Sequence, residues 1–316
     1  MRVMMTLRFL QYCLMLFLTI FLLSCQWLTK NQSEKPKNML LYVTVDWEGR
    51  SLDEEDIVEM QNFRQKFPHI PMLQLLNAAY FVRGHEYPER LTQIIKSTFL
   101  PADTQGLHVH AWKSLTQHCG VQYQHSPSFS DDDENCQEGD CGYTVSLEFA
   151  YTQKSLTKLL ACSSEVLVKN GFNQPEHFRA GGWQLGPKLT AALAANGFIW
   201  DSSKIDADLL ATRWHKDSGI VKMLRQLHPN STPVDQPYLM LPILMEYPNN
   251  AALADYTTTK QIVALFKGLI AANKQVMVLG FHQETAADFL MRLEKAIPQM
   301  EAIAKAHNIK LEWVSQ

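Results

Sequence analysis

The sequence has little excess charge of either sign. Of its 316 residues, 29 are Lys or Arg and 32 are Asp or Glu, which gives a net charge of −3. A nucleic-acid-binding domain would need a concentrated basic face, so we expect no nucleic-acid partner. Hydrophobic residues make up 46% of the chain and charged residues 19%, a balance that excludes a disordered protein. A chain of this length and composition can bury a sizeable core.

The apolar run near the N-terminus is too short to span a bilayer comfortably. It extends from Cys13 to Leu23 and follows two basic residues, Arg2 and Arg8. A short apolar run after positive charge is typical of the hydrophobic region of a secretory signal. We therefore expect the rest of the chain to be exported.

A small residue, Ser24, precedes Cys25 and completes a sequence that resembles a bacterial lipobox. This predicts a signal peptide over 1–24 and, over 25–38, a lipidated Cys25 followed by a polar tether. Gln26 after the cysteine slightly favours the outer membrane, with the domain facing the periplasm. An uncleaved N-terminal membrane anchor is the alternative.

Cysteine is scarce, and no Cys-x-x-Cys pair is present, which excludes a zinc ribbon. Four cysteines remain after the signal peptide and the lipidated position are set aside: Cys119, Cys136, Cys141 and Cys162. An even number in an oxidising compartment favours two disulfides, with three possible pairings. We prefer Cys136–Cys141 with Cys119–Cys162, and four free thiols are the alternative.

From residue 39 onward, short apolar runs alternate with amphipathic stretches. The strand candidates are 39–46, 70–76, 106–111, 176–180, 197–201, 239–245, 275–281 and 309–314, and the helix candidates are 53–66, 86–97, 151–170, 186–196, 257–273 and 285–307. Such alternation predicts parallel strands joined by crossover helices. No Gly-x-Gly-x-x-Gly follows a strand, so an α/β barrel is a better match than a dinucleotide-binding fold. Two segments, 118–145 and 202–238, interrupt the alternation and are predicted to be long loops.

Ionisable side chains recur where the predicted strands end. They are Asp46, Glu48, His108, His110, Arg179, Asp201 and His282. In a parallel barrel the carboxyl ends of all strands open onto one face, which is where such barrels carry out their chemistry. These side chains are therefore predicted to meet in one site.

The spacing within two of these strand ends predicts a metal site. Residues i and i+2 of a strand point to the same side, so Asp46 and Glu48 share a face, as do His108 and His110. Two imidazoles and one carboxylate are the ligands of a hydrolytic zinc site that leaves a position open for water. A single buried histidine is more often a core residue, but the two pairs together favour a metal.

The order of these motifs resembles that of the polysaccharide deacetylase (NodB-homology) family. The matching motifs are Asp46-x-Glu48, His108-x-His110, Arg179-Ala-Gly-Gly, Asp201-Ser-Ser and Leu279-Gly-Phe-His282. The resemblance covers residues 39–316 as one catalytic domain. It implies a distorted (β/α) barrel of about seven parallel strands. It also implies an enzyme that removes N- or O-linked acetyl groups from a polysaccharide with a divalent metal, usually zinc, with cobalt or nickel as alternatives.

The first motif of that family implies a catalytic base and a metal ligand. Thr44-Val45-Asp46 matches its first half, so the resemblance gives Asp46 the role of the base. Trp47 stands where the family usually has a metal-binding aspartate. The ligand role therefore moves to Glu48, which strand geometry places on the same side as Asp46.

The second and third motifs also depart from the usual pattern. The position four residues after His108 is Trp112, so the second histidine ligand is expected to be His110. Gly181 replaces the usual proline after Arg179, which the resemblance pairs with the base.

The role of proton donor to the leaving group falls to His282, on the opposite wall of the predicted site. For the residue that supports this histidine, the sequence leaves three candidates: Trp200, Asp201 and Trp214. For Asp201, capping the turn into the two following serines is the favoured interpretation.

Trp47, Trp112 and Trp183 flank the proposed catalytic residues. Aromatic rings at the rim of a site bind sugar rings well, and we consider all three as substrate-binding candidates. Burial in the upper part of the barrel is an equally good interpretation.

The expected partners are a polysaccharide and, through the lipid anchor, a membrane, with the protein as a monomer. Peptidoglycan, a secreted poly-N-acetylhexosamine and a capsular or lipopolysaccharide sugar are all compatible with the sequence. Three alternatives remain open: an inactive glycan-binding lipoprotein of the same fold, a hydrolase of the same fold that cleaves non-peptide C–N bonds in a small molecule, and a periplasmic solute-binding lipoprotein.

Overall fold

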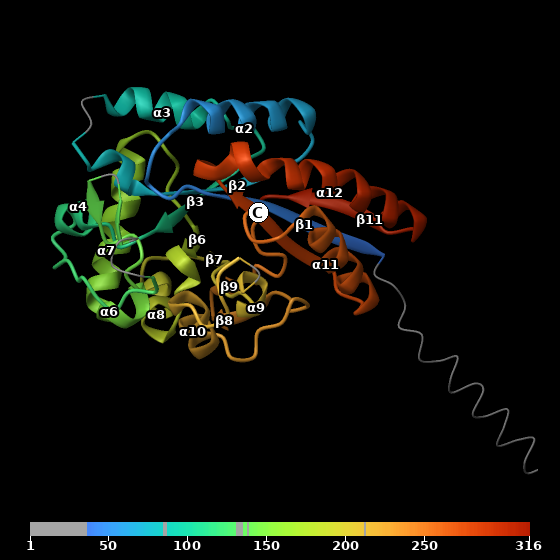
Figure 1. Cartoon of the computed structure of the whole chain (residues 1–316). Coiled ribbons are helices and arrows are strands. Elements are labelled where there is room, and N and C mark those ends of the chain that lie inside the picture. Colours follow the sequence, from blue (N-terminus) through green and yellow to red (C-terminus); the bar gives the residue numbers. More distant parts are fainter. Residues whose placement is uncertain (1–36, 85–86, 131–134, 138, 212) are drawn as a thin grey trace, which may run out of the picture.

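The computed structural model of the chain describes residues 37–84, 87–130, 135–137, 139–211 and 213–316. The predicted signal peptide (1–24) and Cys25 lie outside these residues, as does the tether up to residue 36. The first described strand begins at Asn38 (Figure 1).

A curled sheet forms the centre of the molecule (Figure 1). Its nine strands are β1 (Asn38–Asp46), β2 (Met72–Leu76), β3 (Thr104–Val109), β6 (His177–Ala180), β7 (Trp200–Asp201), β8 (Tyr238–Leu241), β9 (Leu244–Glu246), β10 (Val276–His282) and β11 (Lys310–Val314). They follow the order β10-β1-β2-β3-β6-β7-β9-β8, and β11 pairs with the first half of β1. Every pair is parallel except β8 with β9. The predicted fold class, a distorted (β/α) barrel of about seven parallel strands, is confirmed.

Helices cover the outside of this sheet (Figure 1). The α-helices are α2 (Glu54–Lys66), α3 (Pro88–Lys96), α4 (Lys113–His118), α6 (Leu147–Ala150), α7 (Gln153–Lys169), α8 (Pro187–Ala195), α9 (Ala207–Leu210), α10 (Gly219–Leu227), α11 (Thr259–Ala271) and α12 (Ala286–Ala306). Three 3₁₀ turns, η1 (Ala78–Phe81), η2 (Gly181–Trp183) and η3 (Gln283–Thr285), follow β2, β6 and β10. The start of α11 is fixed by a capping box, in which Thr258 and Gln261 satisfy each other's backbone N–H groups.

The two faces of β1 belong to different parts of the core. Met39, Leu41, Val43, Val45 and Trp47 pack into the large cluster that includes residues of α2 and α12. Tyr42, on the other face, packs inside the barrel with side chains of β2 and β10. The alternation follows from the two-residue repeat of a strand. It turns the even-numbered residues of β1 toward the barrel interior.

The segment 249–254 closes the ring between β9 and β10. The Ala251 N–H donates to the Val278 carbonyl oxygen at 3.1 Å, and the Ala254 N–H donates to that of Gly280 at 2.8 Å. Leu253 forms an isolated parallel bridge with Gly280. This short connection replaces a full strand, which is one reason that the barrel is distorted.

Two details of the predicted elements were wrong. The expected strand 239–245 is a hairpin of β8 and β9, because Pro242 cannot continue the ladder of hydrogen bonds and a turn forms at residues 242–243. The expected loop 202–238 contains the helices α9 and α10. Apolar side chains of α10, among them Val221 and Leu224, are buried in a separate small core cluster.

The structure contains the two disulfides that we prefer from the sequence. Cys119 pairs with Cys162 across a separation of 43 residues, and Cys136 pairs with Cys141. The short strands β4 (Cys136–Gln137) and β5 (Asp140–Cys141) form a hairpin around the second bond. The first disulfide therefore ties Cys119 to α7, and the second links the two strands of the small hairpin.

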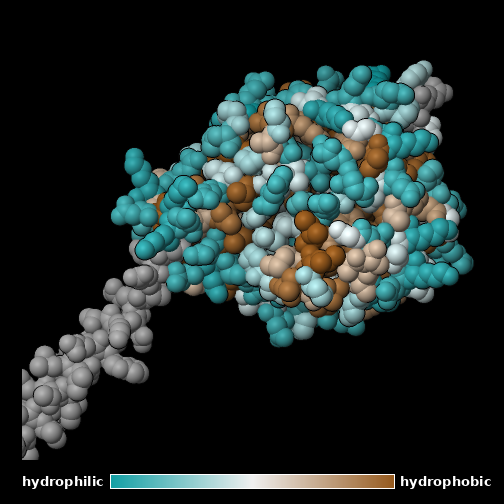
Figure 2. All heavy atoms as spheres, turned by 180° about the vertical axis from the view of Figure 1, so that it is seen from behind, coloured by the Kyte–Doolittle hydropathy of each residue, from teal (hydrophilic) through white to brown (hydrophobic). Residues whose placement is uncertain are grey.

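The surface seen from behind is mostly hydrophilic, with apolar residues gathered in a few small areas (Figure 2). Among the described residues, we find no helix with the length and apolar character needed to cross a membrane.

Candidate active site

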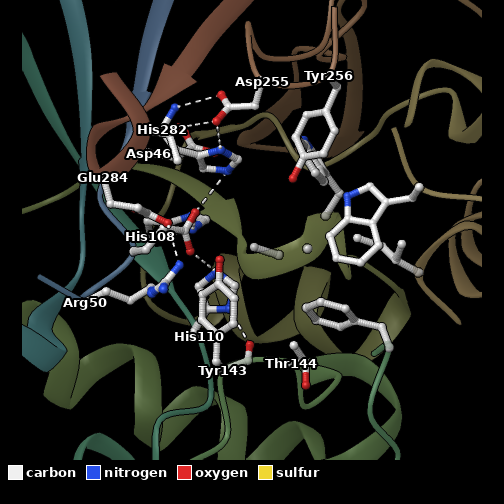
Figure 3. A pocket seen from close by; sticks show the side chains of 18 of the residues that line it. Asp46, Arg50, His108, His110, Tyr143, Thr144, Asp255, Tyr256, His282 and Glu284 are labelled. Atoms are coloured by element: carbon white, nitrogen blue, oxygen red, sulfur yellow. Dashed lines mark hydrogen bonds and ion pairs between the residues drawn. The ribbon is translucent and has the colours of Figure 1, made fainter. Parts of the chain in front are cut away.

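Strand pairing brings the predicted site residues together at the carboxyl end of the barrel. In the register of the sheet, Asp46 of β1 lies opposite His282 of β10, and His108 of β3 lies opposite Arg179 of β6. Glu48 follows β1 by two residues. Figure 3 shows Asp46, His108, His110 and His282 around one cavity, which Glu48 also lines. The cavity has a volume of about 540 Å³.

Three buried side chains form a cluster with the composition of a metal site. One ligand atom each from Glu48, His108 and His110 lies within 4.8 Å of the others. The Nε2 atom of His108 is 3.4 Å from Oε1 of Glu48, and Nε2 of His110 contacts Oε2 of the same carboxylate. Oε2 of Glu48 and both Nε2 atoms are buried and have no hydrogen-bond partner. Such groups carry a desolvation cost that coordination to a cation would offset.

The two imidazoles are already held in the orientation that a metal ligand needs. Nδ1 of His108 is 2.9 Å from the Arg179 carbonyl oxygen, and Nδ1 of His110 is 2.5 Å from that of Tyr143. A carbonyl oxygen only accepts, so each Nδ1 is the donor, and each Nε2 is the ring nitrogen that faces Glu48 and could coordinate a cation. Together with the unpartnered Nε2 atoms, this arrangement fits a divalent cation.

The Glu48 backbone is held by groups from two other segments. The Trp112 indole N–H and the Asn77 side-chain amide both donate to the Glu48 carbonyl oxygen, at 2.8 and 3.1 Å. The next residue is Gly49, with φ of 75°. A Cβ at this position would lie 2.9 Å from Asn77 and Ala79. The turn that leads away from Glu48 therefore depends on glycine.

Charge also favours an ionised Glu48. Burial by itself would raise the pKa of this carboxyl, but the neighbouring His110 and His108 hold it well below its usual value. The carboxylate is therefore available as a ligand at neutral pH.

Asp46 is fixed by a buried arginine. Nη1 of Arg179 donates to Oδ1 of Asp46 and to the Thr44 hydroxyl, both at 2.7 Å. The remaining guanidinium donors bond to Ser202, whose carbonyl and hydroxyl oxygens accept from Nε and Nη2 at 2.8 Å each. Arg179 is 0% exposed. Four hydrogen bonds hold this buried guanidinium in one position, and it in turn fixes the Asp46 carboxylate.

His282 has a carboxylate partner of its own. Its Nδ1 is 3.2 Å from Oδ1 of Asp255, and its Nε2 is 3.1 Å from Oε1 of Glu48 (Figure 3). Burial would lower the pKa of this imidazole, but the charge of Asp255 raises it well above its usual value. Burial also acts to raise the pKa of Asp255, yet His282 lowers it. The pair is therefore an imidazolium with a carboxylate.

A further carboxyl, Glu284, lines the cavity beside the cluster. Burial and the negative charge of Glu48 raise its pKa well above the usual value, although Nη1 of Arg50 lies 3.4 Å from its Oε1. Its Oε2 is buried without a hydrogen-bond partner. In the metal-free site, burial and the Glu48 charge therefore favour the neutral form of Glu284.

The prediction of sugar contact was wrong for two of the three tryptophans. Trp47 and Trp112 are fully buried and do not line the cavity. Trp47 lies on the outer face of the sheet, where its indole N–H donates to Gln74, because odd-numbered residues of β1 point away from the barrel interior. Trp112 supports the Glu48 backbone. Trp183 does line the cavity, and its backbone lies in the left-handed region, with φ of 55°.

The residue that supports His282 was not among the three candidates. Asp201 caps its turn, accepting from the Ser203 N–H and hydroxyl at 3.0 and 2.7 Å. Trp200 packs in the cluster with Tyr42, and Trp214 lines the cavity without bonding to His282. Asp255 has this role instead. It belongs to no strand, and the pairing of segment 249–254 with β10 brings it to His282.

Sequence reasoning missed two more cavity residues, of which Glu284 alone could have been found from spacing. Glu284 follows His282 by two residues, the same spacing as in Asp46-x-Glu48. Tyr143, whose ring stacks on His110 with centroids 4.3 Å apart, comes from the disulfide-bearing segment. Its position could not be inferred without the fold.

Gly181 is required by the position of His110. A Cβ there would lie 2.6 Å from Cε1 and Nδ1 of the imidazole. Tyr143 stacks on the same ring, so the ring has little room to move. We expect Gly181→Ala to weaken zinc binding by at least about 10-fold, as other changes around metal ligands do. Competition with a chelating dye measures this affinity.

The matched control for that substitution is Gly268→Ala, on α11, where a Cβ would meet nothing within 4 Å. It should bind zinc like the unaltered protein. Equal zinc affinity in the two alanine variants would contradict the role of Gly181.

A scan against protein-family models finds no match for the chain, and a search of curated proteins finds none either. Among solved structures, it is similar to a protein described as a polysaccharide deacetylase from Mycobacterium smegmatis (13% identity, TM-score 0.48, 90% of this chain and 88% of that chain covered). It is also similar to the chitin deacetylase of the fungus Colletotrichum lindemuthianum (9%, 0.43, 89% and 88%). A third is a CE4 family pseudoenzyme from Bacillus anthracis (10%, 0.38, 88% and 64%). The solved structures that this chain resembles thus include polysaccharide and chitin deacetylases as well as a pseudoenzyme.

Proposed function

We propose that the protein is a metal-dependent hydrolase that removes N- or O-linked acetyl groups from a polysaccharide of the cell envelope or the extracellular space. One observation carries the proposal. A single cavity holds the Glu48–His108–His110 cluster, in which three buried ligand atoms lack a hydrogen bond, a carboxylate fixed by Arg179 and an imidazolium fixed by Asp255. These are the parts that hydrolysis of an amide or ester requires: a cation site, a base and an acid.

Asp46 supplies the base. One of its oxygens lies within 4.8 Å of an atom of Glu48 and an atom of His282, which leaves room for a water molecule among the three. That water adds its oxygen to the acetyl carbonyl carbon and gives a proton to Asp46. Arg179 holds the Asp46 carboxylate in place through a charge-assisted hydrogen bond.

His282 supplies the acid. When the bond between the carbonyl carbon and the sugar nitrogen or oxygen breaks, the leaving atom needs a proton. The imidazolium of His282 faces the cavity opposite His110 and gives that proton. Asp255 compensates its positive charge and fixes its Nδ1 side, so that Nε2 is the donor. The products are acetate and a free amine or hydroxyl group on the sugar.

Glu48, His108 and His110 would hold a divalent cation such as zinc, cobalt or nickel. Such a cation would lower the pKa of a water molecule and polarise the acetyl carbonyl.

The test is acetate release from a neutral N-acetylglucosamine oligomer and from an O-acetylated oligosaccharide. The protein is stripped with a chelator and then loaded with zinc, cobalt or nickel. We expect release that depends on the metal. A protein that binds the oligomers but releases no acetate with any of the metals would instead be an inactive glycan-binding protein of this fold.

We further propose that the domain is held at a bacterial envelope membrane through lipid on Cys25, facing the periplasm. The lipobox-like sequence before this residue supports the proposal. In a Gram-negative host, labelled palmitate should enter the wild-type protein and not the Cys25→Ser variant. Equal labelling of both would contradict it.

A further inference from the structure

A second cavity adjoins the active site and carries two arginines. It has a volume of about 530 Å³ and is lined by Arg213, Arg292 and Phe289 among others. Asp255 and Tyr256 line both this cavity and the active-site cavity, as does Arg213. A polymer that presents one sugar to His282 therefore has a neighbouring sugar within reach of the second cavity.

The two guanidinium groups are brought close together. Nη1 of Arg213 and Nη1 of Arg292 donate to the same atom, the Asp255 carbonyl oxygen, at 3.2 and 3.3 Å. Both groups also lie over the Phe289 ring, at 4.9 and 4.4 Å from its centroid. Two positively charged groups that donate to the same oxygen atom repel each other, so the arrangement costs free energy in the absence of an anion.

No carboxylate of the described residues compensates this charge. Neither Arg213 nor Arg292 forms an ion pair with an acidic side chain there, and each bonds to backbone carbonyl oxygens. The Asp255 carboxylate, which lines the same cavity, is directed to His282 and to the Thr285 hydroxyl. Arg213 is exposed and Arg292 is half-buried, so a ligand can reach both groups.

Other groups in the same cavity suit a sugar that carries an anion. Gln261 accepts the Thr258 N–H with its side-chain oxygen, which leaves its NH₂ group as a donor. Tyr256, shared with the active site, offers an aromatic ring. Paired guanidinium donors bind carboxylate, phosphate and sulfate oxygens through charge-assisted hydrogen bonds.

We propose that Arg213 and Arg292 form a subsite for an anionic group on the sugar next to the one that is deacetylated. The inference rests on the proposed function for the identity of the polymer. It makes the natural substrate an acidic polysaccharide, with a carboxylate, phosphate or sulfate on a neighbouring residue, rather than a neutral one.

The test uses three N-acetylglucosamine tetramers: a neutral one, one oxidised to carboxylates at C6 and one sulfated at C6. Binding is measured by calorimetry and acetate release in parallel. We expect the zinc-loaded protein to bind at least one anionic tetramer about 10-fold more tightly than the neutral one. Arg213→Gln and Arg292→Gln should each remove this preference by raising Kd and KM for the anionic tetramer alone.

Two controls separate charge from structure. Arg292→Lys keeps a positive charge and should retain part of the preference even if the glutamine variant folds poorly. Arg90→Gln removes an exposed arginine on α3, far along the chain from both cavities, and should change nothing.

The outcomes also separate this inference from the proposed function. Binding of an anionic tetramer that depends on Arg213 and Arg292, without acetate release, would support the subsite and count against the proposed enzymatic activity. Acetate release with equal affinity for all three tetramers, and with the same affinities in the arginine variants, would overturn the subsite. The proposed enzymatic function would then still be supported.

Discussion

Replacing Glu48 with glutamine is expected to lower zinc affinity by more than about 100-fold and to remove metal-dependent acetate release. Changes to residues that only support a metal ligand typically cost 10–100-fold, and Glu48 would be a ligand itself. Glutamine has nearly the same volume, so the buried position stays filled. What is lost is the negative charge that the two imidazoles stabilise. Isothermal titration with zinc measures the affinity.

The matched control is Glu89→Gln, which changes an exposed glutamate at the start of α3. It should bind zinc like the wild type. Circular dichroism of both variants shows whether the fold is kept. If the Glu48 variant bound zinc with wild-type affinity, this carboxylate could not be a ligand.

Asp46→Asn is expected to lose activity on both an N-acetyl sugar and an activated ester, whereas His282→Gln is expected to lose it on the N-acetyl sugar only. Each should lower turnover of an N-acetyl sugar by about 10²–10⁴-fold, the usual contribution of one general acid or base. With 4-nitrophenyl acetate the leaving group departs without a proton. The His282 variant should therefore recover most of its activity on this ester, whereas the Asp46 variant should not.

Steady-state kinetics of both variants with both substrates give this comparison directly. Zinc content has to be measured alongside, because His282 also contacts Glu48. The stability of the Asp46 variant needs a separate check, since a buried Arg179 charge without its partner costs about 3–5 kcal/mol. Equal losses of both variants on both substrates would contradict the assignment of separate roles.

The sequence was sufficient to predict those parts of the site that lie on regular strands. Asp46, His108, Arg179 and His282 are at strand ends, and the two-residue repeat of a strand places Glu48 and His110 beside them. The same repeat explains the error at Trp47. It alternates with Asp46 and Glu48, so it had to point to the other face of β1.

Residues outside the strands could not be predicted in the same way. Asp255 reaches His282 through the irregular segment 249–254, and Tyr143 reaches His110 from a segment fixed by disulfides. No periodic pattern marks either position. The helix α10 was missed because its segment also contains charged residues and prolines that are typical of loops.

The role of Gly181 shows how a departure from a family pattern can have a local cause. At this position the family that the sequence resembles usually has proline, and here no side chain is tolerated because the His110 ring occupies the space. The glycine at position 181 is therefore matched to the position of the His110 ring in this chain.

The most direct test of the account is X-ray absorption spectroscopy of the zinc-loaded protein. It should show one zinc per chain with two imidazole nitrogens at about 2.0–2.1 Å and at least one carboxylate oxygen at about 2.0–2.2 Å. The imidazole signal should fall by half in His110→Ala. A protein that takes up no zinc at equimolar metal, or a zinc whose imidazole signal is unchanged in that variant, would contradict a metal centre formed by Glu48, His108 and His110.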